Sequence, residues 1–290
     1  MITEVTKDII KKVYPERPQE SRKYDLGLLL VIGGSEFYSG SPALSALAAF
    51  RAGVDMVRVI APKRAADIIA SFTPDLAAYP LDGEFIQGSH LATLLTQTES
   101  AKTVASGRMA VVIGGGIGRT KETQQVVLSY LSKVSVPVVV DADAIHALSK
   151  NEGVISNKPF LLTPHTYEFF ILTGREVYKI SSYEEKAKIV QEEAKRLGTT
   201  ILLKGRTDII SDGENVALNR TGGPFLAVGG TGDTLAGIAG ALLARGVSPF
   251  EAGQAAAYLN GLAGEIAGKE FGDSLMATDL INSIVRAINS

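Results

Sequence analysis

The chain has 290 residues, enough for one large α/β domain or two smaller ones, and its 46% hydrophobic and 21% charged residues are typical of a globular protein. A formal net charge of −2 gives it no general attraction to nucleic acids or anionic membranes. The absence of cysteine excludes disulfides, thiolate nucleophiles and zinc–thiolate sites. The sequence contains no run of about 18 apolar residues, so no membrane span is predicted, and residues 1–5 lack a signal-peptide pattern. We expect a cytoplasmic protein.

Short, unbroken apolar runs recur along the chain and alternate with stretches of helical character. They lie at residues 28–32, 57–60, 111–113, 136–140, 160–162 and 201–203. Continuous hydrophobicity is typical of strands that are covered on both faces in a parallel sheet. We therefore predict an α/β fold with three layers, in which a mostly parallel central sheet has helices on both faces.

Three serines mark predicted helix starts, because an N-cap serine accepts a hydrogen bond from a free backbone N–H group. They are Ser41 before a helix at 43–52, Ser182 before one at 186–197, and Ser248 before one at 252–267. Asp212-Gly213 lies between two strand-like segments and predicts a β-hairpin at 208–216. Without a linker or repeat, we expect a polar N-terminal segment at 1–25, which wraps the surface or is partly mobile, and a single domain at 26–290.

Polar loops follow several of these runs, and ligands in open α/β sheets bind beyond the carboxyl ends of strands. Gly33-Gly34 leads into the predicted helix start, which is able to hold an anion. The loop 114–119 carries Arg119 where a dinucleotide-binding fingerprint needs its last glycine, so we reject a Rossmann site there and expect a ligand wall. Asp141 and Asp143 are candidates for organising Mg²⁺-bound water or a hydroxyl; local turn hydrogen bonding is the alternative.

Charged side chains also follow the last two runs. His165 comes directly after Thr163-Pro164, with Glu168 three residues on, so its imidazole is a candidate for the cleft; a structural or exposed histidine is the alternative. Lys204 opens the loop 204–208 and is a candidate for binding nucleotide phosphates as a point charge, the alternative being a solvated loop lysine. No G-x-x-x-x-G-K-[ST] motif is present, which excludes a Walker-type phosphate loop.

The most informative segment is 229–237, Gly-Gly-Thr-Gly-Asp-Thr-Leu-Ala-Gly. Glycines and a threonine lead into an apolar helical segment at 235–243, with Asp233 at the junction. Bare backbone N–H groups at a helix start can bind a phosphate, and a carboxylate there can bind a substrate hydroxyl or take its proton. The alternative is a glycine-rich turn in which Asp233 only caps the helix.

In this order the motifs resemble the ribokinase-like superfamily and, within it, the ADP/ATP-dependent NAD(P)H-hydrate dehydratases. The similarity covers residues 27–287 and rests on segments 38–43 (Tyr-Ser-Gly-Ser-Pro-Ala), 51–53 (Arg-Ala-Gly), 116–118 (Gly-Ile-Gly), 141–144 (Asp-Ala-Asp-Ala), 163–165 (Thr-Pro-His) with Glu168, 204–205 (Lys-Gly) and 230–233 (Gly-Thr-Gly-Asp). Many related vitamin kinases have asparagine where His165 stands. The chain departs from the dehydratase pattern at Ser41, Gly115 and Arg206, where alanine, proline and a small polar residue are usual.

The resemblance implies repair of hydrated nicotinamide cofactors. A dehydratase of this kind phosphorylates the C6 hydroxyl of the S-epimer of hydrated NADH or NADPH, and phosphate then leaves as the ring nitrogen supplies electrons. With ADP favoured over ATP as donor, the products are NADH or NADPH, AMP and phosphate. Two alternatives remain open: a vitamin-precursor kinase of the hydroxyethylthiazole or hydroxymethylpyrimidine type, and a non-catalytic nucleotide-binding sensor.

The resemblance also implies roles for individual residues. Asp233 would deprotonate the hydroxyl while Gly230, Thr231 and Gly232 hold the transferring phosphoryl group. The other implied contacts are with substrate at Ser41, Ala43, Gly118, His165 and Asp233, with nucleotide at Lys204, Gly205, Arg206, Thr207, Asp208 and Gly232, and with Mg²⁺ through water at Glu168, with Asp143 as a second candidate. Because a helix start lowers the pKa of an aspartate, Asp233 is expected to be a weak base, which a loose transition state tolerates.

Relatives of this kind form homotetramers, so the resemblance implies a homotetramer; the small-residue helices at 236–244 and 252–267 allow close packing, either between copies or inside one. Many relatives also carry an N-terminal epimerase domain, and we expect any epimerase to be a separate polypeptide.

Overall fold

The computed structural model describes residues 2–290, in which ten strands form a single sheet. The strands are β1 (Ile2–Glu4), β2 (Leu28–Ile32), β3 (Met56–Pro62), β4 (Ala77–Leu81), β5 (Met109–Ile113), β6 (Val138–Val140), β7 (Phe160–Leu162), β8 (Thr200–Leu203), β9 (Asp208–Ser211) and β10 (Val216–Asn219). Their order is β1-β10-β9-β8-β7-β6-β5-β2-β3-β4. Only the pairings of β9 with β8 and with β10 are antiparallel among the described strands, and β9 and β10 form the predicted hairpin.

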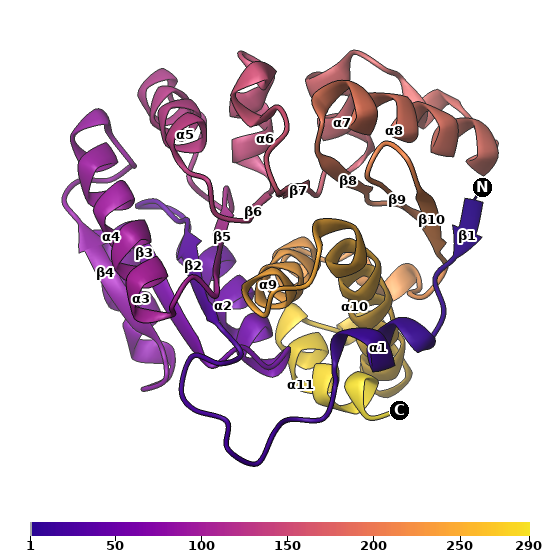
Figure 1. Ribbon diagram of the computed structural model, residues 1–290, viewed down its shortest axis with the longest axis horizontal. Coiled ribbons are helices and arrows are strands. Elements are labelled where there is room, and N and C mark those ends of the chain that lie inside the picture. Colours follow the sequence, from indigo (N-terminus) through magenta and orange to yellow (C-terminus); the bar gives the residue numbers. More distant parts are fainter. Residues whose placement is uncertain (1) are drawn as a thin grey trace.

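Helices cover both faces of the sheet (Figure 1). One layer contains α1 (Asp8–Val13), α2 (Gly40–Arg51), α3 (Lys63–Phe72), α9 (Thr231–Ala244), α10 (Pro249–Phe271) and α11 (Ala277–Ile288). The other contains α4 (Leu91–Val104), α5 (Lys121–Lys133), α6 (Asp143–Leu148), α7 (Thr166–Thr173) and α8 (Tyr183–Leu197). The predicted three-layer α/β fold with a mostly parallel sheet is therefore confirmed.

The central strands are apolar at every position because each face of the sheet meets its own hydrophobic core. In β2, Leu29 and Val31 belong to the core under α2 and α9, whereas Leu28, Leu30 and Ile32 belong to the core under α4 and α5. All five side chains are buried. An uninterrupted run of this kind is expected when neither face of a strand is left to water.

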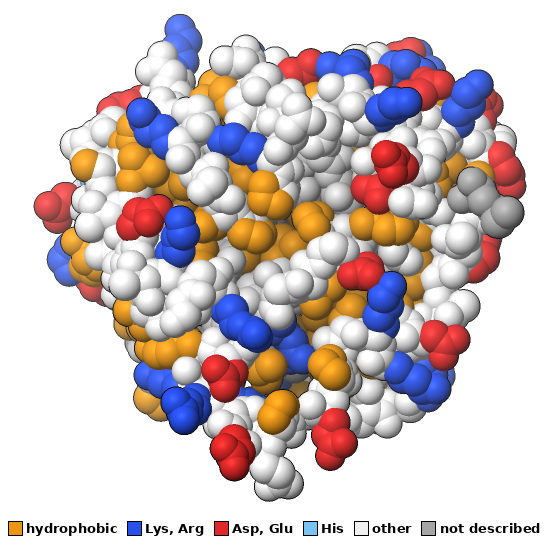
Figure 2. Space-filling view, viewed as in Figure 1, with side chains coloured by type: hydrophobic (Ala, Val, Ile, Leu, Met, Phe, Trp, Pro, Cys, Tyr) orange, Lys and Arg blue, Asp and Glu red, His pale blue; other side chains and the backbone are white. Residues whose placement is uncertain are grey.

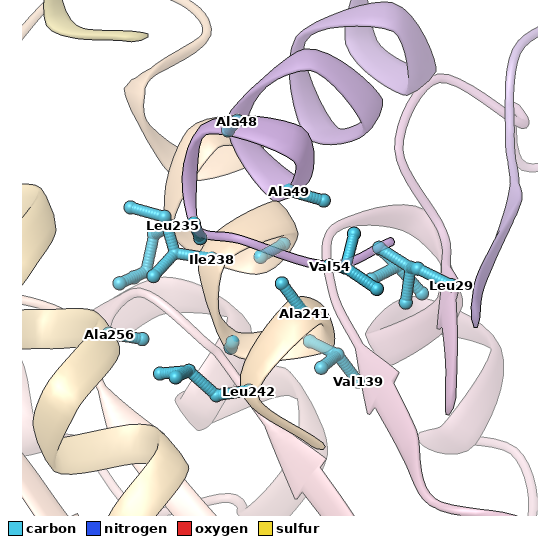
Figure 3. Packing of buried hydrophobic residues seen from close by; sticks show 14 of the residues in the cluster. Leu29, Ala48, Ala49, Val54, Val139, Leu235, Ile238, Ala241, Leu242 and Ala256 are labelled. Atoms are coloured by element: carbon cyan, nitrogen blue, oxygen red, sulfur yellow. The ribbon is translucent and has the colours of Figure 1, made fainter. Parts of the chain in front are cut away.

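Helix α9 lies wedged between α2 and the sheet (Figure 3). Two glycines permit this close approach: a Cβ at Gly237 would lie 2.1 Å from the Ser45 carbonyl oxygen of α2, and a Cβ at Gly240 would lie 2.5 Å from the Val112 side chain of β5. Every residue of α9 from Thr234 onward is buried. The small residues of α9 thus pack inside the protomer, which fixes the start of α9 against the start of α2.

Two of the three predicted helix starts are confirmed. Ser182 and Ser248 are the N-caps of α8 and α10, and each hydroxyl accepts the backbone N–H group three residues on. The prediction for Ser41 is wrong, because α2 begins at Gly40 and Ser39 occupies the N-cap position without a side-chain cap. Ser41 lies inside the first turn, where its hydroxyl is free to bond outside the helix.

The N-terminal segment expected to wrap the surface contributes regular structure. β1 pairs in parallel with β10 at one edge of the sheet, and Ile10 and Val13 of α1 enter the hydrophobic core. At the other edge, β4 contains Pro80, which is tolerated because an edge strand leaves backbone positions unpaired. Both edge strands escaped prediction because they are short and largely exposed.

The surface mixes charges of both signs. On the face shown in Figure 2, Lys and Arg side chains are interspersed with Asp and Glu, and no large patch of one sign forms there. Within residues 2–290, none of the helices has the length and apolar character needed to cross a membrane.

Candidate active site

The loops that follow the central strands are joined by hydrogen bonds at the carboxyl end of the sheet. The Gly34 N–H group donates to the Gly115 carbonyl oxygen (2.8 Å), joining the loops after β2 and β5. Thr163, after β7, donates from its hydroxyl to Asp141 after β6 (2.8 Å). A parallel bridge pairs His165 with the residue that follows β8. Most of the segments predicted to form the site therefore meet here.

The first turn of helix α9 lies at the same carboxyl end of the sheet. Gly230 occupies the N-cap position with φ of +96°, a left-handed conformation that favours glycine. Thr231 holds the preceding loop, because its hydroxyl donates to the carbonyl oxygens of Leu226 (2.8 Å) and Val228 (3.0 Å). The backbone N–H groups of this first turn have no partner within the helix and lie at its positive end, so the turn suits an anion.

Asp233 lies in the first turn of α9 and does not cap it, since Gly230 is the N-cap and has no side chain. The carboxylate instead accepts a hydrogen bond at Oδ1 from the Ser41 hydroxyl of α2. One turn further along α2, Ser45 donates to the Asp233 carbonyl oxygen (2.9 Å). The alternative in which Asp233 only caps its helix is therefore wrong.

Burial raises the pKa of Asp233 to about 6; the hydrogen bond from Ser41 opposes this rise, Asp141 adds to it, and Lys204 opposes it. The lowered pKa expected from the helix start alone is thus wrong, because the loss of hydration outweighs it. A carboxylate with this pKa is ionised at neutral pH yet is a stronger base than an ordinary aspartate.

Lys204 is held between two buried carboxylates. Its Nζ lies 2.9 Å from Asp141 Oδ1 and 3.9 Å from Glu168 Oε2. Burial acts to lower the pKa of Lys204, but the attraction of Asp141, Glu168 and Asp233 together holds it above its ordinary value. Lys204 is therefore a fixed cation, and the alternative of a solvated loop lysine is wrong. A Cβ at Gly232 would lie 3.5 Å from Nζ, so the cation adjoins the first turn of α9.

His165 and Glu168 form a reciprocal capping box at the start of α7. His165 Nδ1 accepts the N–H groups of Tyr167 (3.1 Å) and Glu168 (3.2 Å), and Glu168 Oε2 accepts the His165 N–H group (2.8 Å). Because Nδ1 accepts these two N–H groups, Nε2 is the nitrogen left to donate toward the site. The side chain is 51% exposed. His165 thus combines the structural alternative with a position at the mouth of the site.

Asp208 shapes the loop 204–208 from within. Its carboxylate accepts the Gly205 N–H group (3.0 Å) and the side-chain amide of Asn219 (3.0 Å), and burial raises its pKa to about 6. Thr207 is also buried, whereas Gly205 and Arg206 are exposed. The exposed half of the loop is therefore the part open to a ligand, and Asn219 is a supporting residue that the sequence did not single out.

A pocket of about 150 Å³ lies between the loop 204–208 and the first turn of α9. Its far wall is the segment 221–223, and Asn260 of α10 also lines it. Asn260 accepts from the Thr234 hydroxyl (2.7 Å) and donates to the Thr231 carbonyl (3.2 Å). These walls were missed from sequence, although Thr221-Gly222-Gly223 shortly before 229–237 was a usable signal.

A larger pocket of about 910 Å³ lies against the N-terminal segment, away from the carboxyl end of the sheet. Two of its cations are already paired, Lys12 with Glu251 (2.6 Å) and Arg17 with Asp55 (2.9 Å). It contains none of the groups that converge on Asp233 and is not the candidate site.

The remaining predicted contacts lie around the edge of the site. The Ala43 side chain is buried in the core under α2. The Gly118 N–H group donates to Asp143 Oδ2 (3.0 Å), and Arg119 pairs with Asp143 Oδ1 (2.6 Å). Asp143 therefore holds the loop 114–119 in place. Ala142 has φ of +48°, an uncommon conformation for a non-glycine residue that is typical of functional sites.

The carboxylates nearest the cation offer a limited metal site. Across residues 2–290 no three His, Cys, Asp or Glu side chains are grouped as a metal cage. Asp141 and Glu168 flank Lys204 from two elements. Mg²⁺ is commonly held by one or two carboxylates together with water and substrate phosphates, so this donor set fits a Mg²⁺ ion that arrives with a nucleotide.

Comparison with known proteins identifies relatives of the whole chain. A family model described as NAD(P)H-hydrate dehydratase matches residues 29–286. A bifunctional NAD(P)H-hydrate repair enzyme of Pyrobaculum aerophilum is 43% identical over 274 residues, which cover 94% of this chain and 52% of that protein. The chain thus spans about half the length of the bifunctional relatives it matches.

Two further relatives match over nearly their full length. An ADP-dependent (S)-NAD(P)H-hydrate dehydratase of Cenarchaeum symbiosum is 38% identical, covering 95% of this chain and 93% of its own. The solved structure of an ADP/ATP-dependent NAD(P)H-hydrate dehydratase from Bacillus subtilis, co-crystallised with ATP and Mg²⁺, is 27% identical with a TM-score of 0.78 and covers 99% of this chain and 98% of that chain.

Proposed function

Because the chain belongs to the NAD(P)H-hydrate dehydratase family, we propose that it dehydrates the S-epimer of hydrated NADH or NADPH with ADP as the favoured phosphoryl donor. The products are NADH or NADPH, AMP and phosphate. The observation that carries this proposal is the carboxylate of Asp233, buried with a raised pKa at the start of α9 and close to the cation of Lys204. A base beside an anion site is what transfer of a phosphoryl group to an alcohol requires.

The reaction begins at the C6 hydroxyl of the hydrated ring. Asp233 accepts its proton, the oxygen attacks the β-phosphorus of ADP, and the bond to AMP breaks. The first-turn N–H groups of α9 and the ammonium of Lys204 stabilise the charge that spreads over the transferring group. The C6–O bond then breaks, phosphate leaves with the electron pair, the ring nitrogen supplies electrons to C6, and loss of the C5 proton restores the double bond.

The surrounding residues divide between the two ligands. Exposed Gly205 and Arg206, together with Lys204 and Gly232, bind the nucleotide, with Thr207 and Asp208 shaping the loop. His165 at the mouth, Ser41 and the loop that contains Gly118 border the hydrated ring, and Ala43 supports them from the core. Glu168 and Asp141 would hold Mg²⁺, which would neutralise the donor phosphates.

One incubation tests the proposed function. The protein is mixed with hydrated NADH, Mg²⁺ and either ADP or ATP, and the absorbance of the reduced nicotinamide and the release of phosphate are followed together. Both should rise in step, faster with ADP. A vitamin-precursor kinase leaves a stable phosphorylated product without either signal, and a sensor binds nucleotide without turnover, so either result would refute the proposal.

We also propose that the protein is a cytoplasmic homotetramer that works after an epimerase has supplied the S-epimer. Support comes from the resemblance described above and not from packing, because the glycines of α9 and α10 pack inside this chain: a Cβ at Gly253 would lie 3.1 Å from Ile210. Sedimentation equilibrium measures the assembly directly, and a monomer at assay concentration would contradict it.

A further inference from the structure

Ser41 places a hydroxyl directly on the catalytic carboxylate from a neighbouring helix. Its Oγ donates to Asp233 Oδ1 from the first turn of α2. The two helices cannot easily shift, since the Ser45 hydroxyl of α2 bonds the Asp233 carbonyl (2.9 Å) and the Gly237 position of α9 packs on the Ser45 carbonyl. The hydroxyl is therefore held on a rigid element.

This contact leaves the two oxygens of the carboxylate unequal. Oδ1 is occupied by Ser41, whereas no group within residues 2–290 donates to Oδ2. We propose that Ser41 is a positioning residue for the base: it fixes the carboxylate so that Oδ2 of Asp233 receives the substrate proton, and it favours the ionised form. This inference rests on the proposed function, in which Asp233 is the base, and it goes beyond the substrate contact expected of Ser41.

The groups around Asp233 make this hydroxyl important. Asp141, after β6, faces Asp233 with a like charge, and Lys204, after β8, faces it with an opposite charge. Lys204 is already bonded to Asp141 and contacts Glu168 of α7, so its positive charge is shared among three carboxylates. From the loop after β5, Gly115 approaches the carboxylate without a side chain, since a Cβ there would lie 2.9 Å from Asp233 Oδ1. Ser41 is thus the one hydrogen-bond donor to this carboxylate in the described part of the chain.

The test compares Ser41→Ala with two controls. Ser41→Thr keeps a hydroxyl at the position, and Ser45→Ala removes an equivalent α2-to-α9 hydrogen bond that ends on the backbone and not on the carboxylate. Each variant is assayed for kcat/KM on hydrated NADH with ADP and Mg²⁺ from pH 5 to 9. In parallel, the Asp233 carboxyl carbon is titrated by NMR without any substrate.

Loss of the donor should raise the pH at which the base ionises. A hydrogen bond to a charged group corresponds to about one pKa unit, so the acid limb of Ser41→Ala should move upward by about one pH unit. At pH 6 this lowers the ionised fraction about fivefold, and at pH 8 the ionised fraction hardly changes. Ser41→Thr and Ser45→Ala should keep the wild-type midpoint.

The two readouts separate the possible failures. An unchanged Asp233 midpoint in Ser41→Ala by NMR, or an equal shift in Ser45→Ala, overturns the positioning role. If the wild-type protein does not turn over hydrated NADH, the proposed function fails, while the NMR titration still decides whether Ser41 controls Asp233. A Ser41→Ala protein that does not fold transfers the test to Ser41→Cys, a weak donor, for which a wild-type midpoint would likewise refute the inference.

Discussion

Replacing Gly115 by alanine tests the geometry of the site with a single methyl group. A Cβ at this position would lie 2.1 Å from Ser41 Oγ and 2.9 Å from Asp233 Oδ1. Gly115 is not among the glycines with positive φ, so the expected effect of alanine there comes from the contacts of its Cβ. The methyl group and the Ser41–Asp233 hydrogen bond cannot both keep their places.

The size of the effect follows from that overlap. Carbon and oxygen atoms that are not bonded approach to about 3.3 Å, so the Ser41 hydroxyl must move by about 1 Å. The Cβ also crowds Asp233 Oδ1, and the hydrogen bond survives only if the carboxylate moves with the hydroxyl, so the base itself is displaced. A displacement of about 1 Å of a catalytic group costs on the order of 100-fold in rate, or about 2.7 kcal/mol of transition-state stabilisation. We therefore expect kcat/KM of Gly115→Ala to fall about 100-fold. Nucleotide affinity should be retained, since the pocket beside the loop 204–208 does not include Gly115.

The matched control is Gly40→Ala on the same side of the site. No atom lies within 4 Å of a Cβ at Gly40, the first residue of α2, so this methyl group should leave activity unchanged. Both variants are assayed for absorbance recovery and checked by circular dichroism and nucleotide titration. A folded Gly115→Ala protein with kcat/KM within about threefold of wild type would refute the close approach of these groups, because the expected loss is about 100-fold.

Further substitutions test the roles of Asp233, His165 and Lys204. Asp233→Asn should lower turnover by about 10²–10⁴. It should also abolish the acid limb of the pH–activity profile near pH 6, because the active ionised form of Asp233 is lost as pH falls through its pKa. Calorimetry should find nucleotide affinity unchanged, and a surviving acid limb would contradict the role of Asp233. His165→Ala removes the acceptor for two N–H groups of α7 and should lower the free energy of unfolding in urea by about 1 kcal/mol. His165→Asn should retain most of this stability, because asparagine is a good N-cap. Equal losses of stability in the two variants would argue against the capping role. Lys204→Met leaves the carboxylates of Asp141 and Glu168 without their shared cation and should cost about 3 kcal/mol of stability at neutral pH. Adding Asp141→Asn to this variant should restore part of the loss. No recovery would mean that the two carboxylates do not destabilise each other.

The buried strands were predictable because burial on both faces leaves a simple mark in the sequence. Leu28–Ile32 and Phe160–Leu162 were located to the residue, since each strand fills two cores. The edge strands were not, because Ile2–Glu4 is exposed and Ala77–Leu81 is interrupted by a proline. The place of β1 depends on pairing with β10, which is distant in the sequence, and that of β4 on pairing with β3, from which α3 separates it. Local sequence patterns do not encode such pairings.

For the site, the sequence located the groups that lie together there better than their hydrogen-bond partners. Asp233, Lys204 and His165 were found from glycine motifs and strand ends. Ser41 was assigned to its own helix, because its true partner lies 192 positions away on α9. The basicity of Asp233 was misjudged for the same reason: the helix start is visible in sequence, whereas the walls that exclude water from the carboxylate come from other parts of the chain.

The setting of α9 has a consequence for motion. From Thr234 to Ala244 this helix is enclosed on all sides, so its amide hydrogens should exchange among the slowest in the protein and the carboxylate at its start should hardly move. On the proposed function, a dinucleotide would reach this carboxylate past exposed neighbours such as the segments 36–38 and 227–229. The proposed base is thus held by the core of the molecule, whereas ligands would meet it through the more exposed segments around it.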